Sequence, residues 1–496
     1  MEFNLQLGMT SALLPVYLQE ISATLYAAAY KHERQVLSAA DLVHADFQEI
    51  ETSMAEGHPC FVANSGRVGF DADDYIAFAP EAGTDIRIVW LAAHRQHTQF
   101  TSSSDLSYER LLLEELGPDT LADFAQRLTG LGLVASDYVY VPVHPWQWFN
   151  KLVFLFATDL AKRDLVCLGY GEDRYRAQQS IRTLFNLSHP RKRYVKMALS
   201  VLNMGFMRGL SADYMRATPA INDWVHQVVE NDPCFAELGF GILREEAAVG
   251  YRSPLLQAAV PSASPYRKML AALWRESPTQ LLGPGRRLMT MAALLHRDRD
   301  GRALLPQLIK ASGVDVDAWL AAYLRCYLAP LLHCLYRYEL AFMPHGENII
   351  LLLEENLPIK ALLKDIAEEA VVMDPEAELP PEVARLRAPV PEDVKVLSIF
   401  TDVFDCFFRY LVQILLEEAG YPEDRFWERV ADCIRVYQAS HPELAAKFQR
   451  YDVFAATFQR SCLNRLQLRN NRQLIDLTDP AKNLQFVGTL ANPVAS

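Results

Sequence analysis

The sequence predicts an α+β fold with a strand-rich centre and a helical C-terminal part. Two observations predict it: segments with strand patterning cluster in the middle of the chain, and helix-like segments dominate after about residue 315. The chain has 496 residues, of which 51% are hydrophobic and 22% are charged. This is the composition of a globular protein, and the length is enough for about two to four structural units around large cores.

Four segments have the pattern of strands: Ile86–Leu91, Tyr138–Val143, Arg193–Val201 and Ile349–Leu353. In the third, apolar residues alternate with Lys196 and small residues, so one face is apolar and the opposite face carries the lysine. The acidic residues and the asparagine that follow the fourth segment predict a turn there.

Two later segments are predicted helices. Tyr323–Phe342 is apolar nearly all round, which indicates a buried helix. Ser398–Ala419 is followed by Gly420, with a proline two residues further on, a pattern that predicts the end of a helix. The proline-rich stretches Arg252–Pro265 and Met373–Asp393 should break regular structure and are the candidate linkers.

Charge and composition exclude several classes of protein. The net charge of -13 repels phosphate backbones, so nucleic-acid binding is disfavoured. No run of apolar residues is long enough to span a membrane, and no lysine or arginine precedes Lys31, so a basic secretion signal is not expected. The eight cysteines form no C-x-x-C pair and are interpreted as reduced thiols. We therefore expect a cytoplasmic protein without nucleic-acid or membrane partners.

The segment from Arg174 to Arg208 is unusual in its charge. It holds eight cations and no acid: Arg174, Arg176, Arg182, Arg191, Lys192, Arg193, Lys196 and Arg208. We interpret it as an anion site, because Arg182 and Lys196 lie in apolar runs, where burying a charge without a partner would be destabilising. Ser180 and Arg182, two apart on a predicted strand, would offer a hydroxyl and a guanidinium to one phosphate. The alternative is a solvated basic face paired with acids elsewhere.

Two turns carry further candidates. His144 follows an apolar strand and is held by Pro145, although a single histidine at a strand end is more often structural. In the second turn, Gly346 permits a tight bend that projects His345, Glu347 and Asn348 around one point. Asp365 follows the next apolar run and could hold Mg²⁺ together with Glu347.

Several common sites are missing from the sequence. There is no G-x-x-x-x-G-K-[ST] phosphate loop, no G-x-G-x-x-G turn and no G-x-S-x-G elbow. His333 with Cys326 and Cys334 on one predicted helix suggests a metal site, but a buried apolar helix explains these residues better.

Taken in order, the motifs resemble the NRPS-independent siderophore synthetases, the IucA/IucC family. The resemblance covers about residues 55 to 370, and Asn464–Asn471 and Asn492-Pro493 look family-like as well. The matching motifs are Gly57-His58-Pro59, Asn64-Ser65-Gly66-Arg67, Phe78-Ala79-Pro80-Glu81, His144-Pro145-Trp146-Gln147, Ser180-Ile181-Arg182-Thr183, Lys196 with Arg208, His345-Gly346-Glu347-Asn348 and Lys364-Asp365.

This resemblance implies a cupped-hand architecture, with a thumb over residues 1–135, fingers that bind the nucleotide phosphates over 136–277, and a mostly helical palm over 278–496. It also implies an ATP-dependent ligase that adenylates a carboxylate, releases pyrophosphate, and passes the acyl group to an amine with release of AMP. Small-molecule carboxylates and amines, ATP and Mg²⁺ are the implied substrates and cofactors, and a homodimer is the family default.

Site roles follow from the same resemblance. Ser180, Arg182, Thr183 and Lys196 would hold the ATP phosphates, and His345 with Asn348 would border the nucleotide and acyl sites. The expected catalytic residues are His144, beside the α-phosphate, Arg182 and His345. Glu347 and Asp365 would position Mg²⁺, while Arg67 and Arg208 would hold the substrate carboxylate. Cancelling the repulsion between a carboxylate and a triphosphate requires such fixed cations.

Two departures from the family pattern affect these expectations. Glu347 stands where many relatives carry glutamine, which adds a charge beside the expected metal site. The Gly57-His58-Pro59 motif comes early, so the thumb is expected to be short at its N-terminus. The segment Leu202–Leu210 resembles synthetases that act on carboxylates already acylated or amidated, which include the aerobactin type and the type that joins N-hydroxy-N-succinyl-diamines. The segment Cys462–Asn471 resembles the second type, which we therefore expect; the alternative is an aerobactin-type ligase acting on citrate or a citrate monoamide.

Two other classes stay open on the sequence. A catalytically silent binding relative would explain the short N-terminus and Glu347. A kinase-like phosphotransferase would share the basic segment and the carboxylates, but it would release ADP instead of AMP and pyrophosphate.

Overall fold

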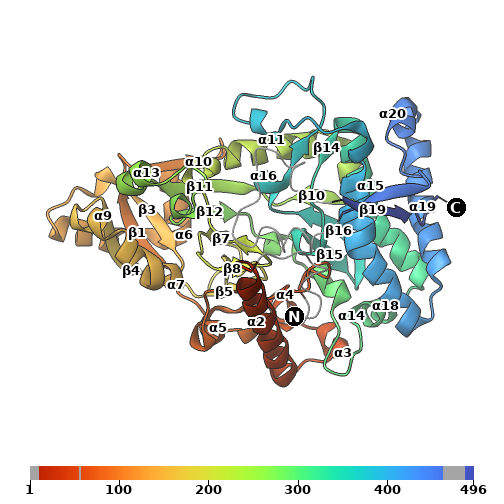
Figure 1. Cartoon of the computed structure of the whole chain (residues 1–496), viewed down its shortest axis with the longest axis horizontal. Coiled ribbons are helices and arrows are strands. Elements are labelled where there is room, and N and C mark those ends of the chain that lie inside the picture. The colour runs from red at the N-terminus through yellow and green to blue at the C-terminus, as the bar shows by residue number, and fades with distance from the viewer. Residues whose placement is uncertain (1–10, 55–56, 462–485, 496) are drawn as a thin grey trace.

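The computed structural model describes residues 11–54, 57–461 and 486–495. The molecule is elongated, with mixed helices and sheets along its length (Figure 1). A small sheet lies at one end, a central sheet follows, and helices around a third sheet form the other end, where the C-terminus lies.

The small sheet has the order β3-β1-β4 and is antiparallel. Its strands are β1 (Val89–His94), β3 (Tyr138–Val143) and β4 (Leu165–Tyr170), with the long helix α6 (Tyr108–Gly130) beside them. Strands β1 and β3 are almost wholly buried, which explains why both read as continuous apolar runs.

The central sheet has six antiparallel strands in the order β2-β11-β12-β7-β6-β5. Their bounds are β2 (Thr98–Ser102), β5 (Tyr175–Ala177), β6 (Thr183–Asn186), β7 (Tyr194–Met197), β11 (Glu245–Tyr251) and β12 (Ala271–Arg275). Lys196 of β7 lies between Thr183 of β6 and Leu273 of β12 in the sheet register. The three strands of this sheet that fall within the basic segment, β5, β6 and β7, are therefore neighbours.

The third sheet has the order β10-β16-β15-β13, in which β10 runs parallel to β16 and the other neighbours are antiparallel. Its strands are β10 (Phe240–Ile242), β13 (Arg286–Thr290), β15 (Ile349–Glu354) and β16 (Leu357–Leu363). The buried helix α15 (Val316–Tyr338) packs on β16 and on α19 (Glu423–Ser440). Aromatic side chains fill this core, including Trp319 and Tyr323.

One long helical segment crosses this region with a change of pitch. It begins as α17 (Leu397–Ile399), continues as a π-helix over Phe400–Phe408, and ends as α18 (Arg409–Ala419), with Gly420 in the left-handed conformation. Helix α15 is the one helix of the described chain that is long and apolar enough to cross a membrane. Because 78% of its most apolar window is buried inside the fold, it is a core helix here.

The N-terminal helix α2 (Leu14–Arg34) lies along one side of the molecule (Figure 1). The remaining bounds are α3 (Ala39–Leu42), α4 (Phe47–Ser53), α5 (Ala72–Phe78), α7 (Pro145–Gln147), α8 (Val153–Leu155), α9 (Ala157–Ala161), α10 (Ala212–Met215), α11 (Thr218–Asn231), α12 (Pro233–Leu238), α13 (Pro254–Ala259), α14 (Leu304–Ser312), α16 (Ile366–Glu369), α20 (Ala445–Arg450), β8 (Leu202–Asn203), β9 (Phe206–Met207), β14 (Leu340–Ala341), β17 (Val371–Val372), β18 (Thr457–Ser461) and β19 (Phe486–Ala491).

Three element predictions need correction. The strand predicted at Ile86–Leu91 is β1, which begins at Val89 and runs to His94. The strand predicted over Arg193–Val201 covers only Tyr194–Met197. The helix predicted to reach Phe342 ends at Tyr338, because Glu339 adopts a left-handed conformation that closes it.

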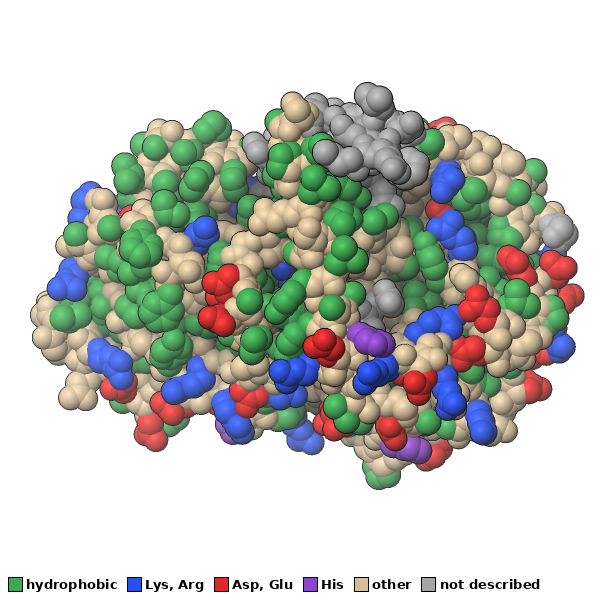
Figure 2. Space-filling view, turned by 60° about the horizontal axis from the view of Figure 1, so that its bottom comes forward, with side chains coloured by type: hydrophobic (Ala, Val, Ile, Leu, Met, Phe, Trp, Pro, Cys, Tyr) green, Lys and Arg blue, Asp and Glu red, His purple; other side chains and the backbone are tan. Residues whose placement is uncertain are grey.

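The predicted α+β class is confirmed, as is the strand at Tyr138–Val143. The domain limits at 135/136 and 277/278 stay predictions. Strand pairing crosses both limits: β1 pairs with β3 across the first, and β10 pairs with β16 across the second. Figure 2 shows one face of the molecule, on which basic and acidic side chains are interspersed along the lower part.

Candidate active site

Lys196 is the centre of a buried cluster of charges. Its side chain is 3% exposed, and its ammonium group lies 2.6 Å from Asp365 Oδ1 and 2.9 Å from Glu368 Oε2. The carboxylate of Glu245 is 3.9 Å away. Burial works against the charged lysine, but Asp365 and Glu368 outweigh it and raise its pKa. The lysine is therefore a fixed positive charge in a water-poor site.

Arg182 reaches the same cluster from a tight turn. Ile181 has a φ of 58°, a conformation that is costly for a β-branched residue and that turns the chain just before β6. The guanidinium of Arg182 donates to the backbone oxygen of Gly209 at 2.7 Å and lies 3.3 Å from Glu368. Ser180 donates to the hydroxyl of Thr183 at 2.8 Å. The predicted strand over Ser180 and Arg182 is thus wrong, and a turn brings these groups together.

Two more arginines complete the positive side. Arg208 donates to the backbone oxygen of Asn203 at 3.2 Å and forms no ion pair within the described residues. Burial, with the nearby charge of Arg182, lowers its pKa to about 10. Arg275 of β12 lies 3.4 Å from Asp365 and stacks over the ring of Tyr194. Sequence reasoning missed Arg275 because it lies outside the basic segment, although it too ends an apolar run.

The negative side comes from the start of α16. Asp365 has a φ of 61° at the point where β16 gives way to the helix, and Glu368 and Glu369 follow it one turn later. Burial together with the neighbouring Asp365 raises the pKa of Glu369 to about 8, although His345 acts in the opposite direction. This crowding of carboxylates fits a hard divalent cation, whose preferred ligands are oxygens. Glu368 and Glu369 were missed, although their helical spacing from Asp365 is visible in the sequence.

The predicted turn at His345 is a short 3-10 helix over Gly346–Asn348. His345 Nδ1 and Glu347 Oε2 are 2.9 Å apart, and Asn348 lies 3.1 Å from the other ring nitrogen. Burial disfavours the charged ring, but the hydrogen bond and charge of Glu347 raise the pKa of His345 to about 9. For Glu347, the effect of burial is outweighed by His58 and His345, and its pKa falls to about 2.

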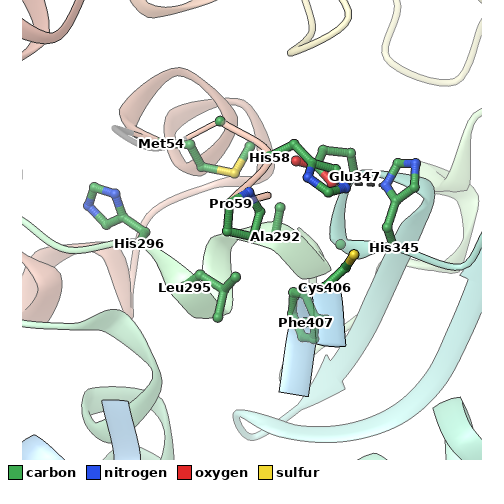
Figure 3. A pocket seen from close by; sticks show the side chains of 12 residues that line it. Met54, His58, Pro59, Ala292, Leu295, His296, His345, Glu347, Cys406 and Phe407 are labelled. Atoms are coloured by element: carbon green, nitrogen blue, oxygen red, sulfur yellow. Dashed lines mark hydrogen bonds and ion pairs between the residues drawn. The ribbon is translucent and has the colours of Figure 1, made fainter. Parts of the chain in front are cut away.

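His58 joins this turn from the N-terminal part of the chain. Its ring lies 5.2 Å from that of His345, centroid to centroid, and His58, His345 and Glu347 each place a ligand atom within 4.8 Å of the others. Figure 3 shows these side chains at one end of a small cavity of about 10 Å³, which has room for about one water. Glu347 thus belongs to a histidine cluster and Asp365 to the lysine cluster, so their shared metal role stays a prediction.

Other predicted residues lie apart or are already engaged. His144 is fully buried beside Phe78, and its Nδ1 accepts from the backbone of Trp146, as a helix cap does. Burial lowers its pKa to about 3, so the ring is neutral. Arg67 is 4% exposed, and its guanidinium binds Glu81 at 2.5 and 2.9 Å. The roles predicted for both remain predictions.

The basic segment divides between the two interpretations made from the sequence. Arg182, Lys196 and Arg208 meet in the cluster described above. Arg174 and Arg176 instead bind Asp85 on the surface, while Arg193 binds Glu114, Glu115 and Glu246. Part of the segment is therefore a paired basic face, and part is a buried cationic site.

Comparison with known proteins agrees with the ordered motifs. Residues 46–296 match the IucA / IucC family, and residues 317–476 match a family described as ferric iron reductase FhuF-like transporter. The putrebactin synthase of Shewanella sp. (strain MR-4) is 51% identical over 490 residues, which are 99% of this chain and 78% of that protein.

The chain belongs to the IucA/IucC family of siderophore synthetases.

Solved structures of this family have the same fold. The aerobactin synthetase IucC of Klebsiella pneumoniae aligns with a TM-score of 0.85 and 30% identity, covering 100% of this chain and 85% of that one. The ATP-bound aerobactin synthetase IucA of the same organism aligns with a TM-score of 0.74 and 17% identity over 99% of this chain and 85% of that one, which shows the fold alone. Of the family-like C-terminal segments, Asn492-Pro493 is buried in part against Val453, whereas Cys462–Asn471 lies outside the described residues.

Proposed function

We propose that this IucA/IucC-family chain is an ATP-dependent ligase that adenylates a carboxylate and then forms an amide with an amine. The observation that carries the proposal is Arg208, which forms no direct ion pair among the described residues and lies beside the buried charges of Arg182 and Lys196, with Glu368, Glu369 and Asp365 near enough to act on its charge. The charged form of such a guanidinium is stabilised when an anion binds beside it, because burial by itself disfavours the charge.

The chemistry begins with a carboxylate oxygen of the substrate attacking the α-phosphorus of ATP, with pyrophosphate as the leaving group. The amine then attacks the acyl adenylate, and AMP leaves. In this scheme Arg182 and Lys196 hold phosphate oxygens, with the hydroxyls of Ser180 and Thr183 at the same turn. Arg208 binds the substrate carboxylate.

Mg²⁺, when bound, offsets part of the negative charge of the triphosphate. Asp365, Glu368 and Glu369 would hold it, since their carboxylates crowd one edge of the cluster and Glu369 gains a proton there unless a cation compensates it. Glu347 is a less direct candidate, because its carboxylate is paired with His345. His345 and Asn348 lie next to these acids, where the nucleotide and acyl sites would meet.

The substrate class proposed is an N-hydroxy-N-succinyl-diamine or a similar hydroxamate-bearing acid. Identity to the putrebactin synthase is 51%, against 30% to the solved aerobactin synthetase IucC, which favours a putrebactin-like product over an aerobactin-like one. The citrate-based ligase therefore remains the second candidate. We also propose the homodimer expected from symmetry statistics.

The test supplies ATP, Mg²⁺ and hydroxylamine as a surrogate nucleophile to a panel of carboxylates. The panel holds citrate, a citrate monoamide, N-hydroxy-N-succinylcadaverine and its putrescine homologue, and the assay measures pyrophosphate, AMP and ADP. AMP and pyrophosphate with a succinyl diamine support the proposal, and the same products with citrate support the alternative. ADP would instead identify a phosphotransferase. ATP binding without turnover would mean that the panel lacks the substrate, and absence of both turnover and ATP binding would favour the catalytically silent relative.

A further inference from the structure

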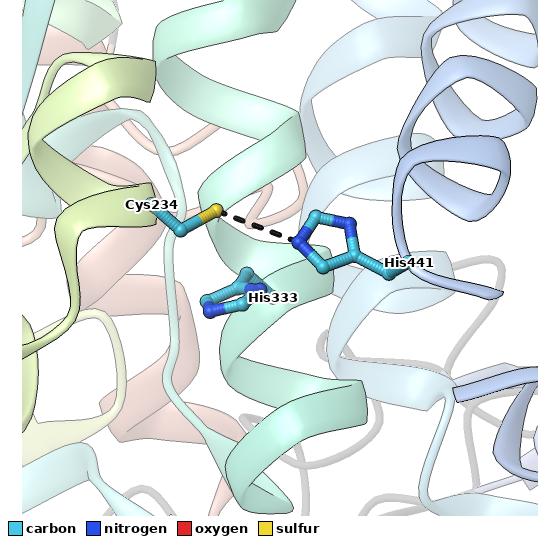
Figure 4. Close-up of side chains that lie close together, drawn as sticks. All are labelled: Cys234, His333 and His441. Atoms are coloured by element: carbon cyan, nitrogen blue, oxygen red, sulfur yellow. Dashed lines mark hydrogen bonds between the residues drawn. The ribbon is translucent and has the colours of Figure 1, made fainter. Parts of the chain in front are cut away.

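A second group of metal-binding side chains lies in the helical region and shares no residue with the site above. Cys234 belongs to α12, His333 to α15, and His441 follows the end of α19. The sulfur and one ring nitrogen of each histidine lie within 4.8 Å of one another. Figure 4 shows the three side chains converging from these separate elements.

The spacing of these atoms is close to that of a metal site. Cys234 Sγ and His441 Nε2 are 3.8 Å apart. Sulfur and nitrogen ligands of one tetrahedral zinc ion, at bond lengths of about 2.3 and 2.0 Å, lie about 3.5 Å from each other. A cation would thus need only a small inward movement of the two side chains.

The histidine rings are already oriented by their outer contacts. His441 Nδ1 is 3.0 Å from the backbone oxygen of Tyr437, which can only accept, so Nδ1 carries the proton and Nε2 presents its lone pair to the sulfur. His333 Nε2 is 2.8 Å from the carboxylate of Asp232, to which Tyr338 also donates. His333 Nδ1 is 3.1 Å from the hydroxyl of Tyr437, a contact that a cation bound at Nδ1 would replace. A carboxylate or carbonyl bonded to the far side of a histidine is the usual support of a metal ligand.

We propose that Cys234, His333 and His441 bind one divalent cation of the zinc type, with a water as the fourth ligand. One thiolate and two imidazoles suit a borderline-soft cation such as Zn²⁺ or Co²⁺, whereas Mg²⁺ requires oxygen ligands. On binding, the S–H bond of Cys234 breaks, its proton leaves to solvent, and the electron pair forms the sulfur–metal bond.

Because Cys234 and His441 are 207 residues apart, the bound cation would join distant segments of the chain. It is therefore expected to stabilise the helical region as a structural clamp.

The test is a titration of the metal-free, full-length chain with Co²⁺, which reports a cysteine ligand by a thiolate-to-cobalt absorption band. We expect the band to saturate at one equivalent and to disappear when Zn²⁺ is added. Cys234→Ser and His441→Gln should lose it. Cys433→Ser is the matched control, because the Cys433 sulfur lies on α19 at 3.7 Å from a backbone oxygen and outside the cluster. His58→Gln, which removes the other histidine cluster, should also keep the band.

Absence of the band in the unmodified chain, or its persistence in Cys234→Ser, would overturn the proposal. Circular dichroism shows whether each variant is folded. A second measurement, the effect of Zn²⁺ on the Tm, is then made on the folded variants. Zn²⁺ should raise the Tm of the unmodified chain and of Cys433→Ser by a few degrees. An equal rise in folded Cys234→Ser or His441→Gln would contradict the assignment.

Discussion

Single residues of the site differ in whether their charge is already balanced. Lys196 and Arg182 have acidic partners, Arg208 has none among the described residues, and Arg67 is held by Glu81. An incoming anion gains most from the cations whose charge is least compensated, provided that they are held in place. This ranking makes Arg208 a better candidate for direct substrate contact than Arg67, which Glu81 already holds.

Replacing Arg182 with alanine should reduce pyrophosphate release by about one to two decades, the effect of one charge-assisted contact of about 1.5–3 kcal/mol. The matched control is Arg174→Ala, in the same basic segment, whose side chain is 63% exposed and binds Asp85. The control should change the rate less than twofold. Equal losses in the two variants would refute a specific role for Arg182.

His345 and Glu347 predict a pH-dependent contribution to stability. The pKa of His345 is raised from 6.5 to about 9, so its stabilisation is complete below pH 6.5 and is lost as the pH rises through about 9. The change amounts to at most about 3 kcal/mol. Glu347→Gln should flatten the fall in the free energy of unfolding between these pH values, as measured by urea denaturation. An NMR titration that finds His345 near pH 6.5 in the unmodified chain would contradict this account.

At the scale of elements, turns with costly backbone conformations position the site. Ile181 and Asp365 both have positive φ, one just before β6 and the other just after β16. Each turn delivers a charged group to the same place, the guanidinium of Arg182 from one and the carboxylate of Asp365 from the other. Strand patterning placed Ser180 and Arg182 on one face of a strand, because it contains no information on such turns.

The turn at Gly346 has no room for an added methyl group. A Cβ there would lie 2.7 Å from the Phe407 ring and 2.9 Å from the Cα of Ala292. Gly346→Ala should therefore lower the free energy of unfolding by about 1–3 kcal/mol and reduce activity, since His345 and Asn348 would be displaced. Gly130→Ala is the control, because nothing lies within 4 Å of its added Cβ. Urea denaturation measures the free energy of unfolding of each variant, and pyrophosphate release measures its activity. If neither quantity changes in Gly346→Ala, the turn can rearrange to accommodate the methyl group.

At the scale of the whole molecule, the candidate site joins two sheets. Lys196 lies in the central sheet and Asp365 follows a strand of the third sheet, 169 residues later. Ligands bound between them should stabilise both parts together.

ATP with Mg²⁺ should therefore raise the Tm of the whole chain by a few degrees. Chelation of Mg²⁺ by EDTA should reduce this shift, since Asp365, Glu368 and Glu369 then repel the phosphates. Arg174→Ala should keep the shift and Arg182→Ala should weaken it, as measured by calorimetry. A shift of the same size with EDTA would argue against a metal among these carboxylates.

The sequence by itself determined the fold class and the family. Hydrophobic periodicity and the ordered motifs depend on neighbouring residues, which is why β3, the end of α18 at Gly420 and the basic segment could all be predicted. Only the tertiary structure decided which charges meet. It grouped Lys196 with Asp365 and Glu368, added Arg275 and Glu369, and paired Glu347 with His345. It also placed His333 with Cys234 and His441 instead of Cys326 and Cys334. The physical reason is that ion pairs and ligand clusters join residues far apart in the chain, and their partners are selected by packing, of which local sequence carries no record.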